Sequence, residues 1–277
     1  DEAAELRAEA TAALAKIDPA RGEKAALALA DAKNMRDRQN AYRILAGIDS
    51  ETVAIFLERR VNNIENEWDG ARLDLIEAAE KREEDHVKKA VAEYKAGLGA
   101  DPLAIFFDLC EKGGTAKNGK TIFLTHAAGQ CSKCHRIGDD GGEAGPRLDD
   151  AGKKYDTKYL LESLVNPSAV VIPGYGITLV TLKGGESVGG ALMREDDEKI
   201  VLKVPSAEDP AVQVEREIAK SEIDVRQPPV SAMPPMTAFL TKQELRDLVA
   251  YLAQQKKSVP GSNAGDHGAK KKKPENE

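Results

Sequence analysis

The sequence predicts a mainly α-helical protein that contains one small antiparallel β insertion. Three observations lead to this fold class. The first hundred residues are rich in Ala, Leu, Glu, Lys and Arg, which favour helices, and they contain an internal repeat. A motif of two cysteines and a histidine at residues 131–135 follows further helical segments. From about residue 170 to residue 227, apolar residues alternate with polar ones instead of recurring every three or four positions.

Composition and charge narrow the classes of protein that fit this chain. Its 277 residues are enough for one or two domains, and a hydrophobic fraction of 41% allows packed cores. The formal net charge of −7 argues against general nucleic-acid binding. No apolar run reaches the roughly 20 residues that a transmembrane segment needs. The chain begins at Asp1 without a signal-peptide pattern, so we expect a mature chain whose targeting segment has been removed.

Residues 1–100 contain a repeat of about 31 positions. Apolar side chains recur three and four positions apart within each copy, as they do on one face of a helix. Asp18-Pro19 and Asp49-Ser50 are suited to begin the second helix of the first two copies. The first copy contains Ala10, Leu14, Ala15, Ile17 and Asp18; the second contains Ala41, Leu45, Ala46, Ile48 and Asp49; a looser third contains Ala71, Leu75 and Ile76.

This region resembles HEAT-like helical repeats, at the short end of their range, and a plain helical bundle is the alternative. Repeats of this kind cannot bury their apolar face alone, so they stack on one another. Trp68 is expected to pack at the start of the third copy. His86 lies among acidic residues, which is typical of a solvated side chain rather than a ligand. We expect the region to support or present the segment that follows it.

The segment Cys131-Ser132-Lys133-Cys134-His135 has the spacing for covalent attachment of a c-type haem. Each thiol can add to one vinyl group of the porphyrin, and the next residue can bind the iron through its imidazole nitrogen. We therefore expect one haem c, attached through Cys131 and Cys134, with His135 as an iron ligand. One alternative is a redox-active cysteine pair, usually found near a βαβ pattern that this chain lacks. The other is half of a zinc site, which would need two more Cys or His ligands.

Short helices are predicted on both sides of this motif. One begins near Asp101-Pro102, a second leads directly into the motif, and a third covers residues 159–164. His126 lies on the second helix, and we do not expect it to bind iron because it precedes the motif rather than lying across the ring. Cys110 is the odd cysteine, and we expect it to be a small buried apolar residue.

Residues 170–227 are predicted to form four to five antiparallel strands in a small sheet or a partly closed barrel. Gly184-Gly185 and the acidic stretch 195–198 are typical of hairpin connections. The insertion could serve as a lid over one edge of a haem or as a docking surface. The alternating runs cover residues 177–181, 188–192 and 200–204, and further candidate strands lie at residues 212–218 and 223–225.

A last helix follows two methionines, Met233 and Met236, which are separated by Pro234 and Pro235. Thr241 and Glu244 are spaced as a capping box at its start. Beyond this helix the chain becomes polar and includes four consecutive lysines, so we expect residues 258–277 to form a disordered tail.

Residues from about 101 to 253 resemble haem-binding domains of the cytochrome c class, which occur in exported bacterial proteins, often after HEAT-like repeats. The resemblance implies that the Pro146 carbonyl accepts the second ring N–H of His135 and that Leu148 contacts the porphyrin. It also implies that Met233 is the second axial ligand of the iron, with Met236 as its competitor. The matching segments are residues 131–135, 145–148, 159–164, 166–169, 173–175 and 233–234.

The resemblance gives the chain three parts and a function. We expect a HEAT-like region at residues 1–100, a cytochrome c-like haem domain at residues 101–257 and the tail. A thioether opposite a histidine fills the coordination sphere and raises the potential, which suits transfer of single electrons rather than catalysis. The expected setting is periplasmic or otherwise exported, with a redox protein as partner, such as an exported quinoprotein dehydrogenase or a terminal oxidase. The alternatives are an electron-accepting subunit or domain of a quinoprotein sugar or alcohol dehydrogenase, and a haem sensor or peroxidase.

Overall fold

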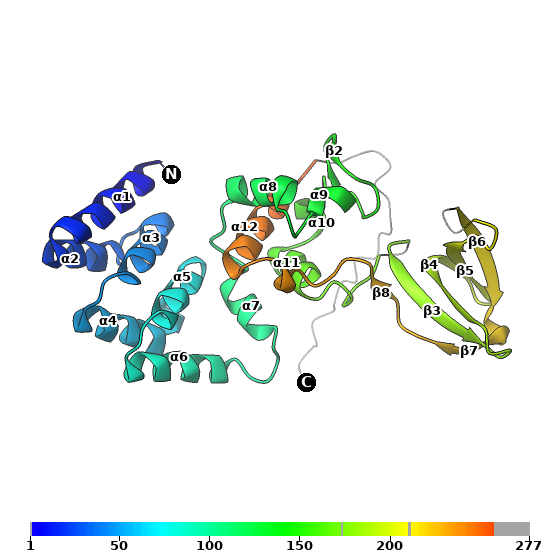
Figure 1. Ribbon diagram of the computed structural model, residues 1–277, viewed down its shortest axis with the longest axis horizontal. Coiled ribbons are helices and arrows are strands. Elements are labelled where there is room, and N and C mark those ends of the chain that lie inside the picture. Colours follow the sequence, from blue (N-terminus) through cyan, green and yellow to red (C-terminus); the bar gives the residue numbers. More distant parts are fainter. Residues whose placement is uncertain (1, 173, 210–211, 258–277) are drawn as a thin grey trace, which may run out of the picture.

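A computed structural model describes residues 2–172, 174–209 and 212–257. Three parts follow one another along the long axis of the molecule: helices α1–α6, a central group of shorter helices, and a β-sheet (Figure 1). The first two parts share one apolar core, whereas the sheet has a core of its own. None of the described helices is long and apolar enough to cross a membrane. The predicted tail, residues 258–277, lies outside the described residues.

The first part, here called the helical array, covers residues 2–97. Its helices α1, α3 and α5 pack one against the next, and α4 packs against α6. The helices form three successive pairs, α1–α2, α3–α4 and α5–α6, so the predicted helical character of this region is confirmed. The bounds are α1 Glu2–Ile17, α2 Pro19–Leu29, α3 Met35–Leu45, α4 Glu51–Asn62, α5 Asp69–Glu80 and α6 Asp85–Gly97, with a 3-10 turn η1 at Ile64–Asn66.

The residues predicted to begin these helices do so in some cases and not in others. Asp18 accepts a hydrogen bond from the backbone N–H of Arg21 and begins α2, as predicted. Ser50 occupies the same position before α4, but its side chain makes no capping hydrogen bond. Trp68 lies at the start of α5, yet it is 40% exposed, and the guanidinium of Arg38 stacks over its ring at 4.7 Å.

A buried ion pair joins the helical array to the last helix, α12 (Lys242–Ala253). Arg246 Nη1 lies 2.7 Å from Asp74 Oδ2, and both side chains are at most 1% exposed. Beside this pair the backbones of Gly70 and Gly113 approach so closely that a Cβ on Gly113 would lie 2.6 Å from Gly70 Cα. The amide of Gln39 donates to both of their carbonyl groups. The array is therefore docked on the central part through buried polar contacts as well as apolar ones.

The central part is organised by the crossing of α8 and α12. A Cβ on Gly119 of α8 would lie 2.0 Å from the Asp247 carbonyl oxygen, so only glycine allows this approach. Next to it, the rings of Phe123 and Tyr251 are 5.8 Å apart. The bounds are α7 Ala104–Leu109, α8 Ala116–Thr125, α9 Cys131–Cys134, α10 Ala151–Lys154, α11 Thr157–Val165 and the 3-10 turn η3 Met236–Ala238, with a hairpin of β1 Arg136–Ile137 and β2 Asp140–Gly141.

The predicted insertion is an antiparallel sheet with strand order β6-β5-β4-β3-β7, and β8 also pairs with β3. The predicted turns are confirmed: Gly185, in the β3–β4 connection, has a φ of +86°, which favours glycine, and β4 and β5 are joined across residues 196–198. Only the two-residue strand β8 was not predicted. The bounds are β3 Gly176–Leu182, β4 Ser187–Glu195, β5 Lys199–Pro205, β6 Gln213–Ala219, β7 Ile223–Arg226 and β8 Val230–Ser231, with a 3-10 turn η2 at Lys220–Glu222.

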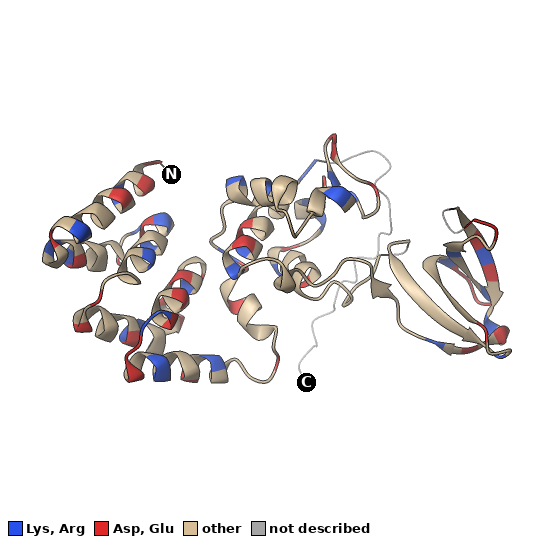
Figure 2. Ribbon diagram, in the orientation of Figure 1, with Lys and Arg blue, Asp and Glu red and all other residues tan. Residues whose placement is uncertain are grey.

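One face of the sheet forms its own small core around Val180, Ile200 and Leu202. The other face is divided. Charged residues lie on β5 and β6, whereas β3 carries none (Figure 2). On that face of β3, Ile177 and Leu179 are exposed. The sheet thus has a core of its own, and the β3 part of its outer face is exposed.

Candidate haem-binding site

The cysteine motif forms one short helical turn, α9, that follows directly on a sharp bend. Gln130 has a φ of 47°, a left-handed conformation that reverses the chain between α8 and Cys131. Cys131 and Cys134 are three positions apart and therefore lie on the same side of the turn. Neither is in a disulfide. Burial raises the pKa of the Cys131 thiol.

His135 is held by a hydrogen bond to the Gly-Pro loop that follows it. Its Nδ1 lies 2.9 Å from the Pro146 carbonyl oxygen, which can only accept, so Nδ1 is the donor. Nε2 of the neutral ring then carries the free lone pair. Burial lowers the pKa of His135, which favours this neutral form. A histidine fixed through one nitrogen and free at the other is typical of metal ligands.

Glycines let the loop close around the motif. The N–H of Gly145 donates to the Cys134 carbonyl at 2.8 Å, and a Cβ on Gly145 would lie 2.7 Å from Cε1 of His135. Gly141 has a φ of +117° and would clash with the His135 carbonyl if it carried a side chain. The N–H of Leu148 then donates to the Arg136 carbonyl at 2.9 Å. The loop therefore forms a cradle that fits the imidazole and allows no larger residue at these positions.

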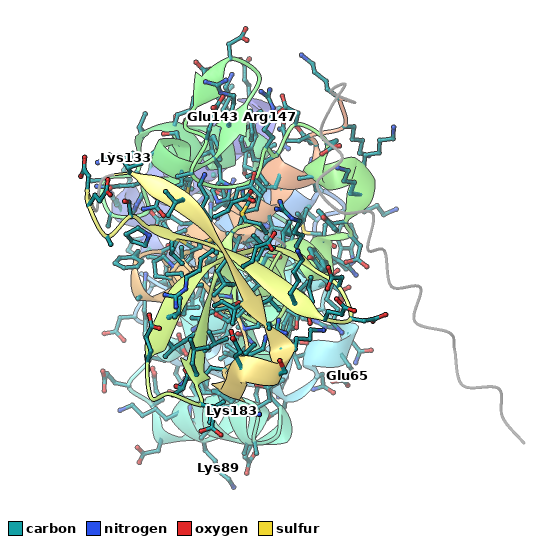
Figure 3. The ribbon with its side chains drawn as sticks, turned by 90° about the vertical axis from the view of Figure 1, so that its right-hand side faces the viewer. Glu65, Lys89, Lys133, Glu143, Arg147 and Lys183 are labelled. Carbon is teal, nitrogen blue, oxygen red and sulfur yellow. The ribbon has the colours of Figure 1, made fainter. Side chains whose placement is uncertain are left out.

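The surface next to the motif carries charges of both signs. Arg136 pairs with Glu143 at 2.8 Å, and Arg147 pairs with Asp149 at 3.0 Å. Seen from the sheet end, Lys133, Glu143 and Arg147 lie in the upper half of the view, whereas Lys183 lies in the lower half (Figure 3). These pairs fix the hairpin that follows the motif rather than creating a surface of one sign.

The two methionines differ in burial. Met236 is 3% exposed and belongs to the apolar core that the helical array and the central part share. Met233 is only half-buried against that core, and its N–H donates to the Ser231 hydroxyl at 3.1 Å. Cys131 and Leu148 are half-buried against the same core. The predicted site residues therefore divide into two groups. Cys134, His135 and Pro146 are linked by hydrogen bonds of the Gly-Pro loop, whereas Cys131, Leu148 and Met233 are half-buried against the shared core.

The two other histidines of the described residues, His126 and His86, have partners of their own, and Cys110 is buried. His126 contacts Gly129 and Glu244, and His86 Nδ1 lies 3.0 Å from Glu58 Oε2. His86 is thus half-buried and paired rather than solvated. Cys110 is fully buried, as predicted, and burial raises its pKa to about 12.

No group of three or more His, Cys, Asp and Glu side chains in the described part of the chain is arranged to hold a metal ion.

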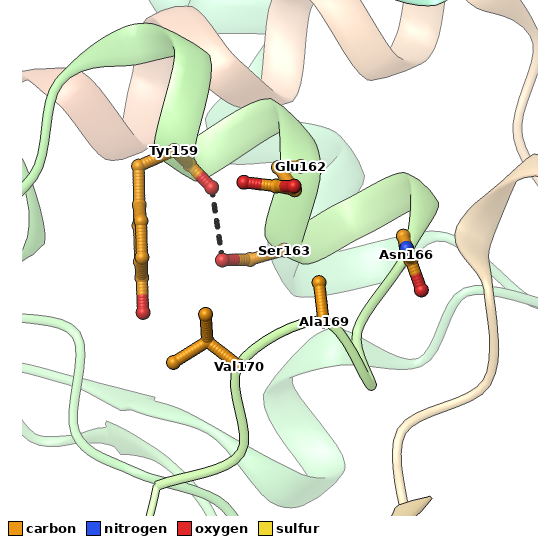
Figure 4. Close-up of a pocket in the computed structure, with 6 residues that line it drawn as sticks. All are labelled: Tyr159, Glu162, Ser163, Asn166, Ala169 and Val170. Carbon is orange, nitrogen blue, oxygen red and sulfur yellow. Dashed lines mark hydrogen bonds between the residues drawn. The ribbon is translucent and has the colours of Figure 1, made fainter. Parts of the chain in front are cut away.

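Two hollows in the described part of the chain lie away from the motif. One has a volume of about 10 Å³, room for a single water, and is lined by residues of α11 and the loop after it, including Tyr159 and Ser163 (Figure 4). The other is an open groove of about 490 Å³ between α2 and α4, lined by residues including Leu27 and Phe56. Neither hollow is lined by Cys131, Cys134 or His135. The candidate site is therefore identified by the two thiols and the imidazole rather than by a pocket in the surface.

Sequence reasoning missed the residues that bring the site together. The approach of α8 and α12 at Gly119 and the contact of His126 with Glu244 both join segments more than a hundred residues apart. A signal was present: Gly119 and Phe123 are one helical turn apart, and Tyr251 is an aromatic residue on the last helix that could pack against them. Without the fold, nothing in the sequence pairs these segments.

The residues present fit a covalently attached haem: two unpaired thiols on one side of a turn, a neutral imidazole with one free nitrogen, and a glycine cradle. Comparison with known proteins agrees. Residues 116–198 match the family model Cytochrome c, from the first residue of α8 to the connection between β4 and β5. No curated protein matches the chain. Helix α12 lies beyond the match, although it packs on α8. The chain therefore contains a cytochrome c domain, which follows an N-terminal helical region.

Proposed function

We propose that this protein is a c-type cytochrome that carries single electrons on one haem c, with Cys131 and Cys134 as the attachment sites. The observation that carries the proposal is the hydrogen bond from His135 Nδ1 to the Pro146 carbonyl, because it leaves Nε2 free on a ring that the glycine loop holds in place. When bound, the haem supplies the one-electron couple of its iron. The protein contributes orientation, burial and the axial ligands.

Met233 is the proposed second axial ligand. Its half-buried side chain has free surface for a further contact, whereas the side chain of Met236 is already enclosed by core residues. The backbone of Met233 is fixed by the Ser231 hydroxyl, and Ser231 in turn pairs with Gly176 and donates its N–H to the Ser168 hydroxyl. The ligand segment is therefore anchored on both sides, by β8 before it and by η3 after it. Leu148 is proposed to contact the porphyrin.

The other parts of the proposal follow from the domain and its resemblance. Successive packing of α1, α3 and α5 with a 31-residue period supports a HEAT-like repeat. Covalent haem attachment supports an exported, periplasmic setting, and a filled coordination sphere supports a carrier rather than an enzyme. The partner is then a second redox protein, such as an exported quinoprotein dehydrogenase or a terminal oxidase.

Spectra and potentials of two variants test the ligand assignment. Met233→Ala is expected to lose the methionine–iron absorption of the oxidised protein and to lower the reduction potential, because a thioether favours reduced iron. Met236→Ala is the matched control: it is expected to lower stability by about 2–5 kcal/mol by opening a cavity while keeping the methionine signature. The opposite pattern would assign Met236 as the ligand. Rapid carbon monoxide binding by the wild-type reduced protein would instead favour a sensor or peroxidase.

A further inference from the structure

One histidine ties the bend before the cysteine motif to the helix after the methionines. His126 ends α8, and its Nδ1 lies 2.9 Å from the backbone nitrogen of Gly129, whose N–H it accepts. Its Nε2 lies 3.4 Å from Oε1 of Glu244 on α12. Because a backbone N–H can only donate, Nδ1 must carry the lone pair, and the ring proton sits on Nε2, facing the carboxylate.

The partner carboxylate belongs to the start of α12. The second oxygen of Glu244 accepts the backbone N–H of Thr241 at 2.8 Å and its hydroxyl at 2.9 Å, which completes the predicted capping box. Leu240, just before this cap, donates its N–H to the Met236 carbonyl at 2.9 Å. A Cβ on Gly129 would lie 3.4 Å from Leu240 Cδ2. The bend at residues 126–130 therefore packs directly on the end of the methionine segment.

We propose that His126 is a positioning residue for the methionine ligand: through Gly129 and Glu244 it fixes the end of the segment that carries Met233. The inference rests on the proposed function, since it requires Met233 to bind iron. A segment held at its end loses less conformational freedom when its ligand binds, so Met233 competes better against a ligand from solution. His126 itself does not touch the iron in this account; it acts through the Leu240–Thr241 backbone.

Competition with imidazole tests this role in the oxidised holoprotein. His126→Ala is expected to bind imidazole about tenfold more tightly than wild type, since about one net hydrogen bond that holds the methionine segment is lost. The reduction potential should fall in the same variant, because the thioether contribution weakens. His126→Gln keeps one acceptor for Gly129 and one donor for Glu244, so it is expected to behave as wild type.

A second histidine–glutamate pair provides the matched control. His86 contacts Glu58 at 3.0 Å in the helical array, and His86→Ala is expected to leave both imidazole affinity and potential unchanged. Met233→Ala sets the upper limit of imidazole affinity. If His126→Ala does not fold, Glu244→Gln tests the same link from the other side, with an expected tightening of about threefold.

Two results would overturn the inference, and they are distinguishable. A folded His126→Ala protein with wild-type imidazole affinity and potential would show that the link is only structural, and the ligand assignment would stand. A wild-type protein that binds imidazole as tightly as Met233→Ala would overturn the ligand assignment, and this inference with it.

Discussion

The central helices α7–α12 are joined to the two flanking parts of the molecule, the helical array and the sheet, in opposite ways. The helical array shares their apolar core and buries the Asp74–Arg246 pair against α12. The sheet has a core of its own, and the Ser231 N–H at its β8 strand donates to the Ser168 hydroxyl in the loop after α11. The difference indicates that the array is a structural part of the central helical core, whereas the sheet is a separately packed module inserted between α11 and α12.

The largest difference is expected between deletion of the helical array and excision of the sheet. Deletion of residues 1–100 exposes the shared core and leaves the Arg246 guanidinium without Asp74, so we expect no soluble folded product. Excision of residues 177–230, with Gly176 joined to Ser231 through an Asn-Gly turn, keeps two residues that already face each other. That variant is expected to fold and retain haem. Expression yield and circular dichroism check both outcomes; a stable array-free domain would contradict the comparison.

Breaking the buried ion pair tests the first joint with a single substitution. Asp74→Ala leaves Arg246 buried without its carboxylate and is expected to cost about 3–5 kcal/mol of unfolding free energy. The control is Asp69→Ala, which removes a half-exposed carboxylate that pairs with Lys112 across the same joint and is expected to cost at most about 1 kcal/mol. Urea denaturation measures both. Equal costs would show that burial of the pair is unimportant.

Cavities in the two cores are expected to cost similar amounts of unfolding free energy but to loosen different parts of the molecule. Leu202→Ala in the sheet and Leu161→Ala in the haem domain both truncate fully buried side chains and should each cost about 2–5 kcal/mol. Leu202→Ala should loosen only the sheet, because its core is separate. Hydrogen exchange read by mass spectrometry would show faster exchange in β3–β6 alone for Leu202→Ala, and throughout the array and haem domain for Leu161→Ala. Identical exchange patterns would contradict two separate cores.

The smallest expected effect is the pH dependence of the stability of the sheet. Arg226 and Lys220 lower the pKa of Glu195 to about 2 through ionic hydrogen bonds. Because the folded pKa lies below the unfolded value, this stabilisation is present above about pH 4.5 and is lost as the pH falls toward 2. The pair is partly exposed, so it contributes at most about 1 kcal/mol.

Glu195→Gln provides the measurement. Urea midpoints of the sheet transition should differ between this variant and wild type at pH 6 and converge near pH 2. A constant difference at both pH values would show that the carboxylate charge is not what stabilises the sheet.

Local signals predicted much of this structure, and pairings across the chain account for the rest. The capping box of Thr241 and Glu244 and the β3–β4 turn depend on a few adjacent residues, so the sequence alone identified them. Arg246, in contrast, lies on an amphipathic helix where arginine is typical of the exposed face. Its burial follows from Asp74, 172 positions away, and becomes visible only when both helices are in place.

The candidate site likewise combines residues that local sequence signals predict with a contact that depends on the fold. Cys131, Cys134 and His135 are adjacent in the sequence, and their chemistry follows from spacing. The contact of His126 with Glu244 depends on the crossing of α8 and α12, which no local pattern encodes.

Haem attachment itself is the most direct test of the account. The protein should be produced in a host that matures c-type cytochromes, denatured, and weighed intact by mass spectrometry beside a Cys131→Ala/Cys134→Ala double variant. The account predicts one haem per wild-type chain that survives denaturation, and none on the double variant. A wild-type chain with the mass of the bare polypeptide and two titratable thiols at these positions would contradict it.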